Sequence, residues 1–129
     1  MIKFKAWDKA HEVMRNVLSI DFTNRSIICE AEDERDIKLY YTTYELMQFT
    51  GIKNIYSGME ICEGDIVKTN RSKYGRFIGY VGDATSKFEV YGVKQYVHLS
   101  AELNGTYEVI GNIYETPHLM NESNSQETK

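Results

Sequence analysis

Apolar and polar residues alternate with a period of two along much of the chain. Ile2, Phe4 and Ala6 alternate with lysines near the start, and the same alternation recurs at 87–90 and 107–113. Successive side chains of a strand point to opposite faces, so a period of two indicates strands that bury one face. We therefore expect half-buried strands at both ends of the chain.

The second half of the chain has the pattern of several short strands in succession. Residues 76–81 and 96–99 are rich in the β-branched and aromatic residues that favour strands. Glycines recur at intervals of roughly ten residues, a spacing typical of small sandwiches and barrels, at positions 64, 75, 82, 92 and 105. The sequence predicts an all-β or β-rich fold, in which residues 65–114 form a small, partly open SH3-like barrel extended by N-terminal strands.

Helical spacing appears in one place, between residues 8 and 20. There the apolar residues fall at the positions that line one face of an amphipathic helix. The segment 44–49 also contains good helix formers, but its brevity and the following Thr50 and Gly51 favour a strand. Pro117 is the only proline, and it predicts a single helical turn through Met120.

Composition and charge limit the classes of protein to which the chain can belong. Its 129 residues are 42% hydrophobic and 12% aromatic, which predicts one folded domain over 1–120. Residues 30–36 hold five acids and one arginine, and 121–129 hold no apolar residue, so we expect a solvated loop and a flexible polar tail. The net charge of −4 argues against a protein that coats nucleic acid or membranes.

The cysteines and the N-terminus indicate a cytoplasmic protein. Cys29 and Cys62 have no second Cys or His at metal-ligand spacing, so we expect two buried thiols in a reducing compartment. Residues 1–7 alternate apolar and basic residues and do not resemble a signal peptide. No apolar stretch approaches the roughly 20 residues that span a bilayer.

Four blocks of sequence carry a resemblance to a known family. They are Phe4–Asp8, Glu45–Lys53, Glu60–Lys68 and Glu108–Glu115. In this order they resemble the YopX-like family of small proteins encoded by bacteriophages and prophages. The resemblance spans residues 2–120 and implies a location in the cytoplasm of a bacterial host. It implies no biochemical activity, since none is established for the family.

The resemblance also changes the interpretation of residues 8–20. In YopX-like proteins the Trp-Asp-Lys sequence, here Trp7 to Lys9, leads through a polar turn into another strand. We therefore favour a β-hairpin over the amphipathic helix, with the next strand beginning near Met14. Trp7 itself is expected to be largely buried as the anchor of the first strand.

No arrangement of residues predicts an enzyme, a metal site or a cofactor. His11 and Glu12 begin a zinc-protease pattern, but Arg15 stands where the second histidine should be. His98 and Ser100 share one face of the expected strand and have no third group that would orient the imidazole. We therefore expect a non-catalytic protein with no cofactor.

One cluster of residues is a candidate for binding a partner. Four cations surround one tyrosine in the cluster, and the candidate residues are Lys68, Arg71, Lys73, Tyr74 and Arg76. Small barrels that bind single-stranded nucleic acid combine such cations with an aromatic ring on which bases stack. A solvated hairpin tip has the same composition, and it is the more common outcome for a run of charges.

Two functions remain as hypotheses. The leading one is a phage or prophage accessory protein that acts through contacts with itself or with a phage or host protein. Ten tyrosines and five phenylalanines exceed what one small core readily hides, which favours a homo-oligomer. The alternative is a small-barrel protein that binds single-stranded nucleic acid through residues 68–76.

Overall fold

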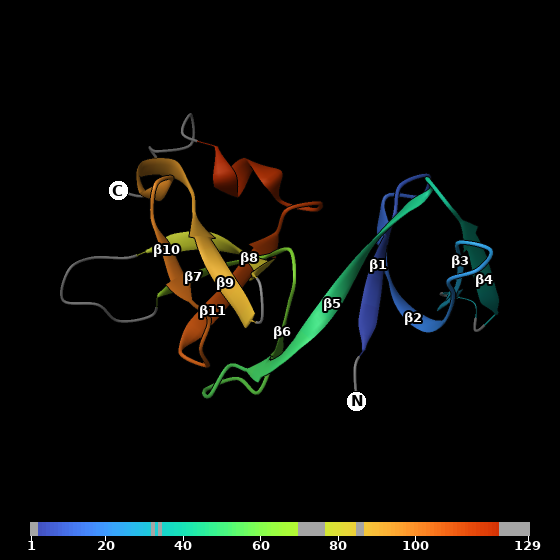
Figure 1. Cartoon of the computed structure of the whole chain (residues 1–129), viewed down its shortest axis with the longest axis horizontal. Coiled ribbons are helices and arrows are strands. Elements are labelled where there is room, and N and C mark those ends of the chain that lie inside the picture. Colours follow the sequence, from blue (N-terminus) through green and yellow to red (C-terminus); the bar gives the residue numbers. More distant parts are fainter. Residues whose placement is uncertain (1–2, 32, 34, 70–76, 85–86, 122–129) are drawn as a thin grey trace. The chain divides into compact units, whose positions relative to one another are not determined.

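The protein is all-β, as the sequence predicts. A computed structural model describes residues 3–31, 33, 35–69, 77–84 and 87–121. These residues form antiparallel strands together with two short 3-10 helices (Figure 1). The chain divides into two compact units, Met1–Phe49 and Thr50–Lys129, and each is described by itself.

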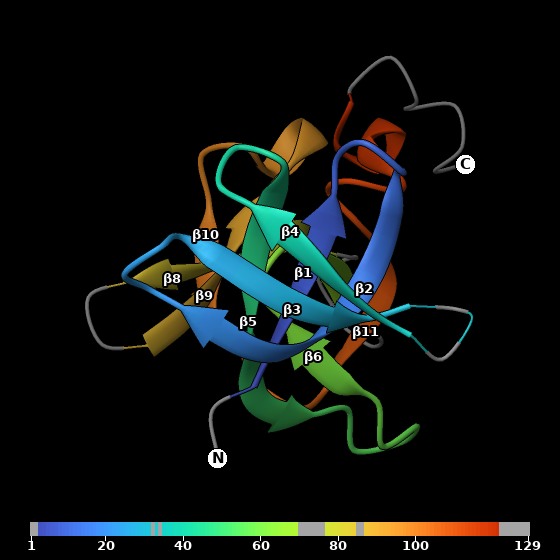
Figure 2. The same cartoon turned by 90° about the vertical axis from the view of Figure 1, so that its right-hand side faces the viewer.

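Unit 1 is an antiparallel sheet of strands connected by short turns. Its strands are β1 (Phe4–Asp8), β2 (Val13–Asp21), β3 (Ser26–Glu30), β4 (Asp36–Tyr40) and the first part of β5 (Tyr44–Lys53). They lie in the order β4-β3-β2-β1-β5, and Figure 2 shows β4, β3 and β2 side by side. The acidic loop predicted at 30–36 is shorter than expected, because Glu30 ends β3 and Asp36 begins β4.

Residues 8–20 form the hairpin and not the helix. Asp8 of β1 pairs with Val13 of β2, and the turn between them contains Glu12 in the left-handed region at φ 54°. Strand β2 bends where its register against β3 shifts between Val17 and Ser19. The register shift interrupts strict alternation after Val17, and Ala10 lies in the turn before the strand, so the apolar spacing did not reflect a helix.

The core of unit 1 lies on one face of its sheet. It is made by Ala6, Ile27, Cys29 and Leu39, all of them less than 9% exposed. Trp7, which is expected to be largely buried, is of intermediate burial and does not belong to this cluster. Ala6 and Asp8 are the residues of β1 with 0% exposure, and Trp7 lies between them on the opposite face.

Unit 2 contains the predicted strand-rich second half of the chain. Its elements are β6 (Glu60–Cys62), β7 (Asp65–Thr69), β8 (Ile78–Ala84), β9 (Lys87–Gly92), η1 (Lys94–Tyr96), β10 (Ser100–Glu102), β11 (Tyr107–Asn112) and η2 (Pro117–Met120). Five strands form a sheet in the order β10-β9-β8-β7-β11, so the last strand returns to the side of the first. Among the described strands no pairing joins β10 to β11, so the sheet does not close into a barrel.

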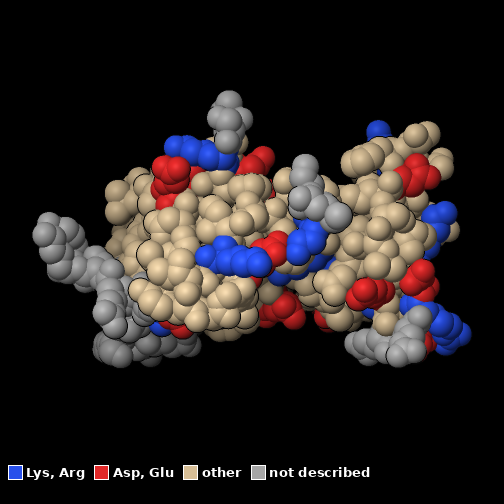
Figure 3. Space-filling view, turned by 90° about the horizontal axis from the view of Figure 1, so that it is seen from below, with Lys and Arg blue, Asp and Glu red and all other residues tan. Residues whose placement is uncertain are grey.

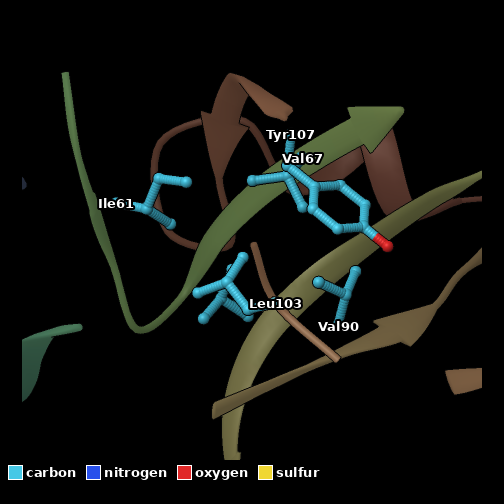
Figure 4. Close-up of a cluster of buried hydrophobic side chains, with 6 residues drawn as sticks. Ile61, Val67, Val90, Leu103 and Tyr107 are labelled. Carbon is cyan, nitrogen blue, oxygen red and sulfur yellow. The ribbon is translucent and has the colours of Figure 1, made fainter. Parts of the chain in front are cut away.

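A compact apolar cluster fills the interior of unit 2. Figure 4 shows side chains from β6, β7, β9, β11 and the segment after β10 pointing toward one another, namely Ile61, Val67, Val90, Leu103 and Tyr107. Val81 completes this set of buried residues. Burial raises the pKa of the Tyr107 hydroxyl, which therefore stays neutral in the core.

The strand predicted at 96–99 is wrong. The chain there forms the end of η1 and a turn, and the following strand begins only at Ser100. Gly92 lets the turn fold back, because a Cβ atom at that position would overlap the carbonyl group of Tyr96. The helical turn predicted after Pro117 is confirmed as η2.

The expected domain boundaries remain predictions. One domain over 1–120 is compatible with either one or two cooperative folding units, and the division at Phe49 does not decide between them. Most of the tail expected at 121–129 lies outside the described residues, which end at Asn121.

Candidate functional site

The basic cluster predicted to bind nucleic acid is described at one residue only. Lys68 lies on β7, and its ammonium group is 3.8 Å from the carboxylate of Glu108 on β11. Arg71, Lys73, Tyr74 and Arg76 lie outside the described residues. On the face of the molecule in Figure 3, Lys and Arg side chains are interspersed with Asp and Glu side chains. Nucleic-acid binding by this cluster remains a prediction.

A cluster of charged residues in unit 1 has the composition of a catalytic site. The Asp8 carboxylate accepts hydrogen bonds from His11 Nδ1 at 2.8 Å and from Arg15 Nε at 2.9 Å. It also accepts the backbone N–H groups of Ala10 and His11, each at 3.2 Å. Burial alone would raise the pKa of Asp8, but the bonds from Arg15 and His11 outweigh it and hold that pKa below its usual range.

The geometry of this cluster is that of a structural support. Asp8 has 0% exposure, and the Arg15 side chain is only 9% exposed, so neither group is open to a substrate. Cys29 lies close enough for both charges to act on it, and burial, the largest influence, raises the pKa of its thiol. A buried thiol whose pKa is raised is a poor nucleophile. Asp8 therefore holds the β1–β2 turn and ties it to Arg15.

The two cysteines and the His98–Ser100 pair do not form a catalytic arrangement. Cys29 and Cys62 are both buried and are not joined by a disulfide, as the sequence predicts. His98 was predicted on a strand with Ser100, but it lies in the turn after η1 and is exposed. Within the described part of the chain, no group of three or more His, Cys, Asp or Glu side chains is placed to hold a metal ion.

A well-ordered surface feature of unit 2 is the loop between β5 and β6, residues 54–59, which we call the Asn54 loop. Asn54 is 6% exposed, and its side-chain amide donates to the carbonyl oxygen of Tyr107 at 2.6 Å. Its side-chain oxygen accepts the N–H groups of Tyr56 at 2.9 Å and Ser57 at 2.8 Å. Backbone bonds from Asn54 to Met59 and from Ile55 to Gly105, both 2.9 Å, close the loop.

This rigid loop exposes apolar side chains. Ile55 is 65% exposed, Tyr56 is 68% exposed and Met59 is 55% exposed. Tyr56 and Met59 also border a hollow of about 430 Å³, whose other walls include Glu108 and Val109 of β11. A projecting apolar group and a hollow therefore lie on the same surface of unit 2. Such a surface is suited to bind a protein.

Two exposed tyrosines of unit 1 are arranged differently. Tyr40 and Tyr41 are each 60% exposed, but cations cover their rings. Lys38 Nζ lies 5.3 Å from the centroid of Tyr40, and the Arg25 guanidinium lies 4.8 Å from that of Tyr41. In these cation–π contacts the cation occupies one face of each tyrosine ring, so that face is not available to a binding partner.

The sequence contains a signal for the Asn54 loop that the sequence analysis missed. Asn54 followed by Ser57 and Gly58 is turn chemistry, because asparagine bonds to the backbone ahead of it and glycine adopts positive φ, here 73°. Ile55 and Tyr56 are unusual residues within such a turn. An apolar pair between turn residues indicates that these side chains are exposed and could contact a partner. The burial of Asn54, in contrast, could be seen only in the structure.

Comparison with known proteins agrees with the sequence resemblance. The family model described as YopX protein matches residues 3–121, which is nearly the whole chain. The chain belongs to the YopX protein family. The match covers both units, including the hairpin at Asp8 and the Asn54 loop.

A solved structure has the same fold as this YopX family member. The chain is similar to the crystal structure of protein EF1440 from Enterococcus faecalis, with 26% sequence identity and a TM-score of 0.63. The alignment covers 94% of this chain and 99% of that chain. No curated protein matches the chain. None of the described helices is long and apolar enough to cross a membrane.

Proposed function

We propose that this YopX family member is a non-catalytic accessory protein of a phage or prophage. It acts in the host cytoplasm through protein–protein contacts, and its first partner is a second copy of itself. The Asn54 loop is the contact surface. The observation that supports this proposal is the exposure of Ile55, Tyr56 and Met59 on a loop that hydrogen bonds hold rigid.

Rigidity favours binding because it reduces the entropy that association costs. A flexible loop would lose conformational freedom on binding, whereas the Asn54 loop is already fixed by its bonds to Tyr107 and Gly105. Tyrosine and other large apolar residues dominate the energetics of interfaces when they lie at the centre of a contact. Tyr56 is therefore the expected anchor of the interface.

A second copy of the chain is the partner to which this surface is best suited. In a two-fold dimer the same patch serves both subunits, so the patch must be complementary to itself. Tyr56 projects beside the hollow bordered by Met59 and Val109, so each copy offers both an apolar projection and a hollow. Exchange of Tyr56 between two hollows satisfies this requirement.

The proposal is tested by measuring mass against protein concentration in the analytical ultracentrifuge. The parent chain should exceed its monomer mass of 15.0 kDa as concentration rises. The double variant Ile55→Ser, Tyr56→Ser should weaken association by about 2 kcal/mol or more, roughly thirtyfold in the dissociation constant. Circular dichroism should show that the fold is retained, because both residues are exposed.

Phe22→Ser is the matched control. Phe22 is 80% exposed and belongs to unit 1, so the change removes an exposed apolar group elsewhere. It should leave association unchanged. If Phe22→Ser weakens association as much as the double variant does, the Asn54 loop is not the contact surface. If the parent chain remains a monomer throughout, self-association itself is excluded.

A further inference from the structure

A second hollow of unit 2 lies beside η1 and has a volume of about 470 Å³. Lys94, His98 and Ser100 contribute potential hydrogen-bond donors to its lining, and Tyr80 and Tyr91 contribute aromatic rings. None of the described residues that line it is acidic, although the chain has a net charge of −4. The hollow therefore has the composition of a site for an anion.

Lys94 is the most unusual residue of this lining. It is only 5% exposed, and it adopts the left-handed region at φ 57°. No hydrogen bond or ion pair joins its ammonium group to any described residue. No buried side-chain nitrogen or oxygen of the described residues lacks a hydrogen-bond partner, so the unpaired ammonium group of Lys94 reaches solvent while the rest of the residue is buried. Lys94 lines the hollow, and an anionic ligand bound there could pair with this group.

The backbone around Lys94 is held in place. The N–H group of Gly92 donates to the carbonyl of Leu99 at 2.8 Å, and the N–H group of Val93 donates to that of Ile78 at 3.0 Å. The ring of Tyr96 contacts Phe77 edge to face, with centroids 5.4 Å apart. Positive φ at a non-glycine residue persists where surrounding contacts fix it, and it is common at binding sites.

The aromatic wall of the hollow is also fixed. The rings of Tyr80 and Tyr91 lie 5.5 Å apart at an interplanar angle of 37°. The Tyr91 hydroxyl donates a hydrogen bond to the carbonyl oxygen of Asp83 at 3.0 Å. Burial, together with the charges of Glu89 and Asp83, raises the pKa of Tyr91, so this hydroxyl stays protonated and continues to donate. A planar ligand can stack on such a wall.

We propose that the hollow beside η1 binds a nucleotide, with its phosphate group at Lys94 and its base against Tyr80 or Tyr91. Three donor-bearing side chains, Lys94, His98 and Ser100, suit a phosphate because it presents several strong acceptor oxygens. The nucleotide is either free or one residue of a single strand, since both present the same phosphate and base. The site is independent of the cluster at residues 68–76.

Calorimetric titration of the full chain tests the site with AMP, adenosine, inorganic phosphate and a deoxyadenosine hexamer as probes. AMP or the hexamer should bind in the micromolar to millimolar range, and adenosine and phosphate should each bind about tenfold more weakly than AMP. Tighter binding of the hexamer than of AMP would identify single-stranded nucleic acid as the ligand. Tighter binding of AMP would identify a free nucleotide. Amide NMR signals of residues 92–100 should shift on binding.

Lys94→Met removes the ammonium group but keeps an unbranched apolar side chain of nearly the same length. It should weaken binding of whichever of AMP and the hexamer binds more tightly by about tenfold or more. Lys87→Met is the matched control, because the Lys87 side chain is 52% exposed in the same unit and does not line the hollow. That control should bind as the parent does. His98→Ala, at an exposed position, is a second variant that should weaken binding if Lys94→Met does not fold.

Three results would overturn the proposal. The first is the absence of binding by both AMP and the hexamer at millimolar concentration. The second is equal binding by the parent and a folded Lys94→Met variant, which would assign the nucleotide to another surface. The third is equal affinity for inorganic phosphate and AMP, because the aromatic wall would then contribute nothing.

Discussion

The side-chain amide of Asn54 donates to the carbonyl oxygen of Tyr107 at 2.6 Å and joins the Asn54 loop to β11. Tyr107 belongs to the buried apolar cluster of unit 2, so the loop is fixed directly to the interior. The same asparagine accepts two backbone N–H groups inside the loop. One side chain therefore determines both the position of the loop and its internal conformation.

Asn54→Ala should destabilise the protein by about 1–3 kcal/mol, because it leaves buried polar groups of the backbone without partners. Urea denaturation measures this free energy of unfolding. Asn104→Ala is the control, since Asn104 makes a similar turn with Thr106 on the exposed surface, and its cost should be only ~0.5 kcal/mol. Equal costs for the two variants would show that the bond to Tyr107 is not important.

Asp8 should make stability depend on acid pH. Its pKa is lowered in the folded protein by the bonds from Arg15 and His11, which outweigh the opposing effect of burial. A carboxyl group whose pKa is lower in the folded than in the unfolded protein contributes its full stabilisation at pH values above its unfolded pKa. This contribution is lost as the pH falls through its folded pKa. The contribution of Asp8 to the free energy of unfolding should therefore be retained down to about pH 5 and be lost progressively as the pH falls through about 4 and below.

The variant Asp8→Asn separates this contribution from those of the other carboxylates. At neutral pH it should cost about 3–5 kcal/mol, because Arg15 is left as a buried charge without its partner. Its stability should then fall less steeply on acidification than that of the parent. Parallel pH profiles for the two proteins would show that Asp8 does not contribute to acid sensitivity.

Ile61 should be among the most important core residues of unit 2. It has 0% exposure and points into the cluster with Val67 and Leu103 (Figure 4). Ile61→Ala should cost about 2–5 kcal/mol, the range for a buried large-to-small change. Trp7→Ala should cost less than Ile61→Ala in the same thermal or urea denaturation, because Trp7 is only half-buried. The reverse order would show that Trp7 contributes more to stability than Ile61 does.

Strand positions were predictable from sequence where alternation was regular. The alternation near residues 2–6 corresponds to β1, and that at 107–113 corresponds to β11, because one face of each strand is buried. The exposure of Trp7 follows from the same alternation, which places it opposite Ala6. The burial of Asp8 did not follow, since it depends on Arg15, seven residues away on the next strand.

The turn at 96–99 shows why local propensity was insufficient. Tyr96, Val97 and Leu99 favour a strand, but tertiary contacts reverse that preference. Gly92 lets the backbone approach Tyr96 closely, and Phe77 holds the Tyr96 ring. The burial of Lys94 results from this fold-back, and no local pattern indicates it. The site beside η1 was therefore not predictable from the sequence.

The central claim is that the Asn54 loop contacts a second copy of the chain. Amide NMR spectra recorded over a dilution series test it most directly, because only residues at a self-association surface change their signals with concentration. The signals of residues 55–59 and of Glu108 and Val109 should shift on dilution, whereas that of Phe22 should not. Spectra in which residues 55–59 stay fixed from millimolar to micromolar concentration would contradict it.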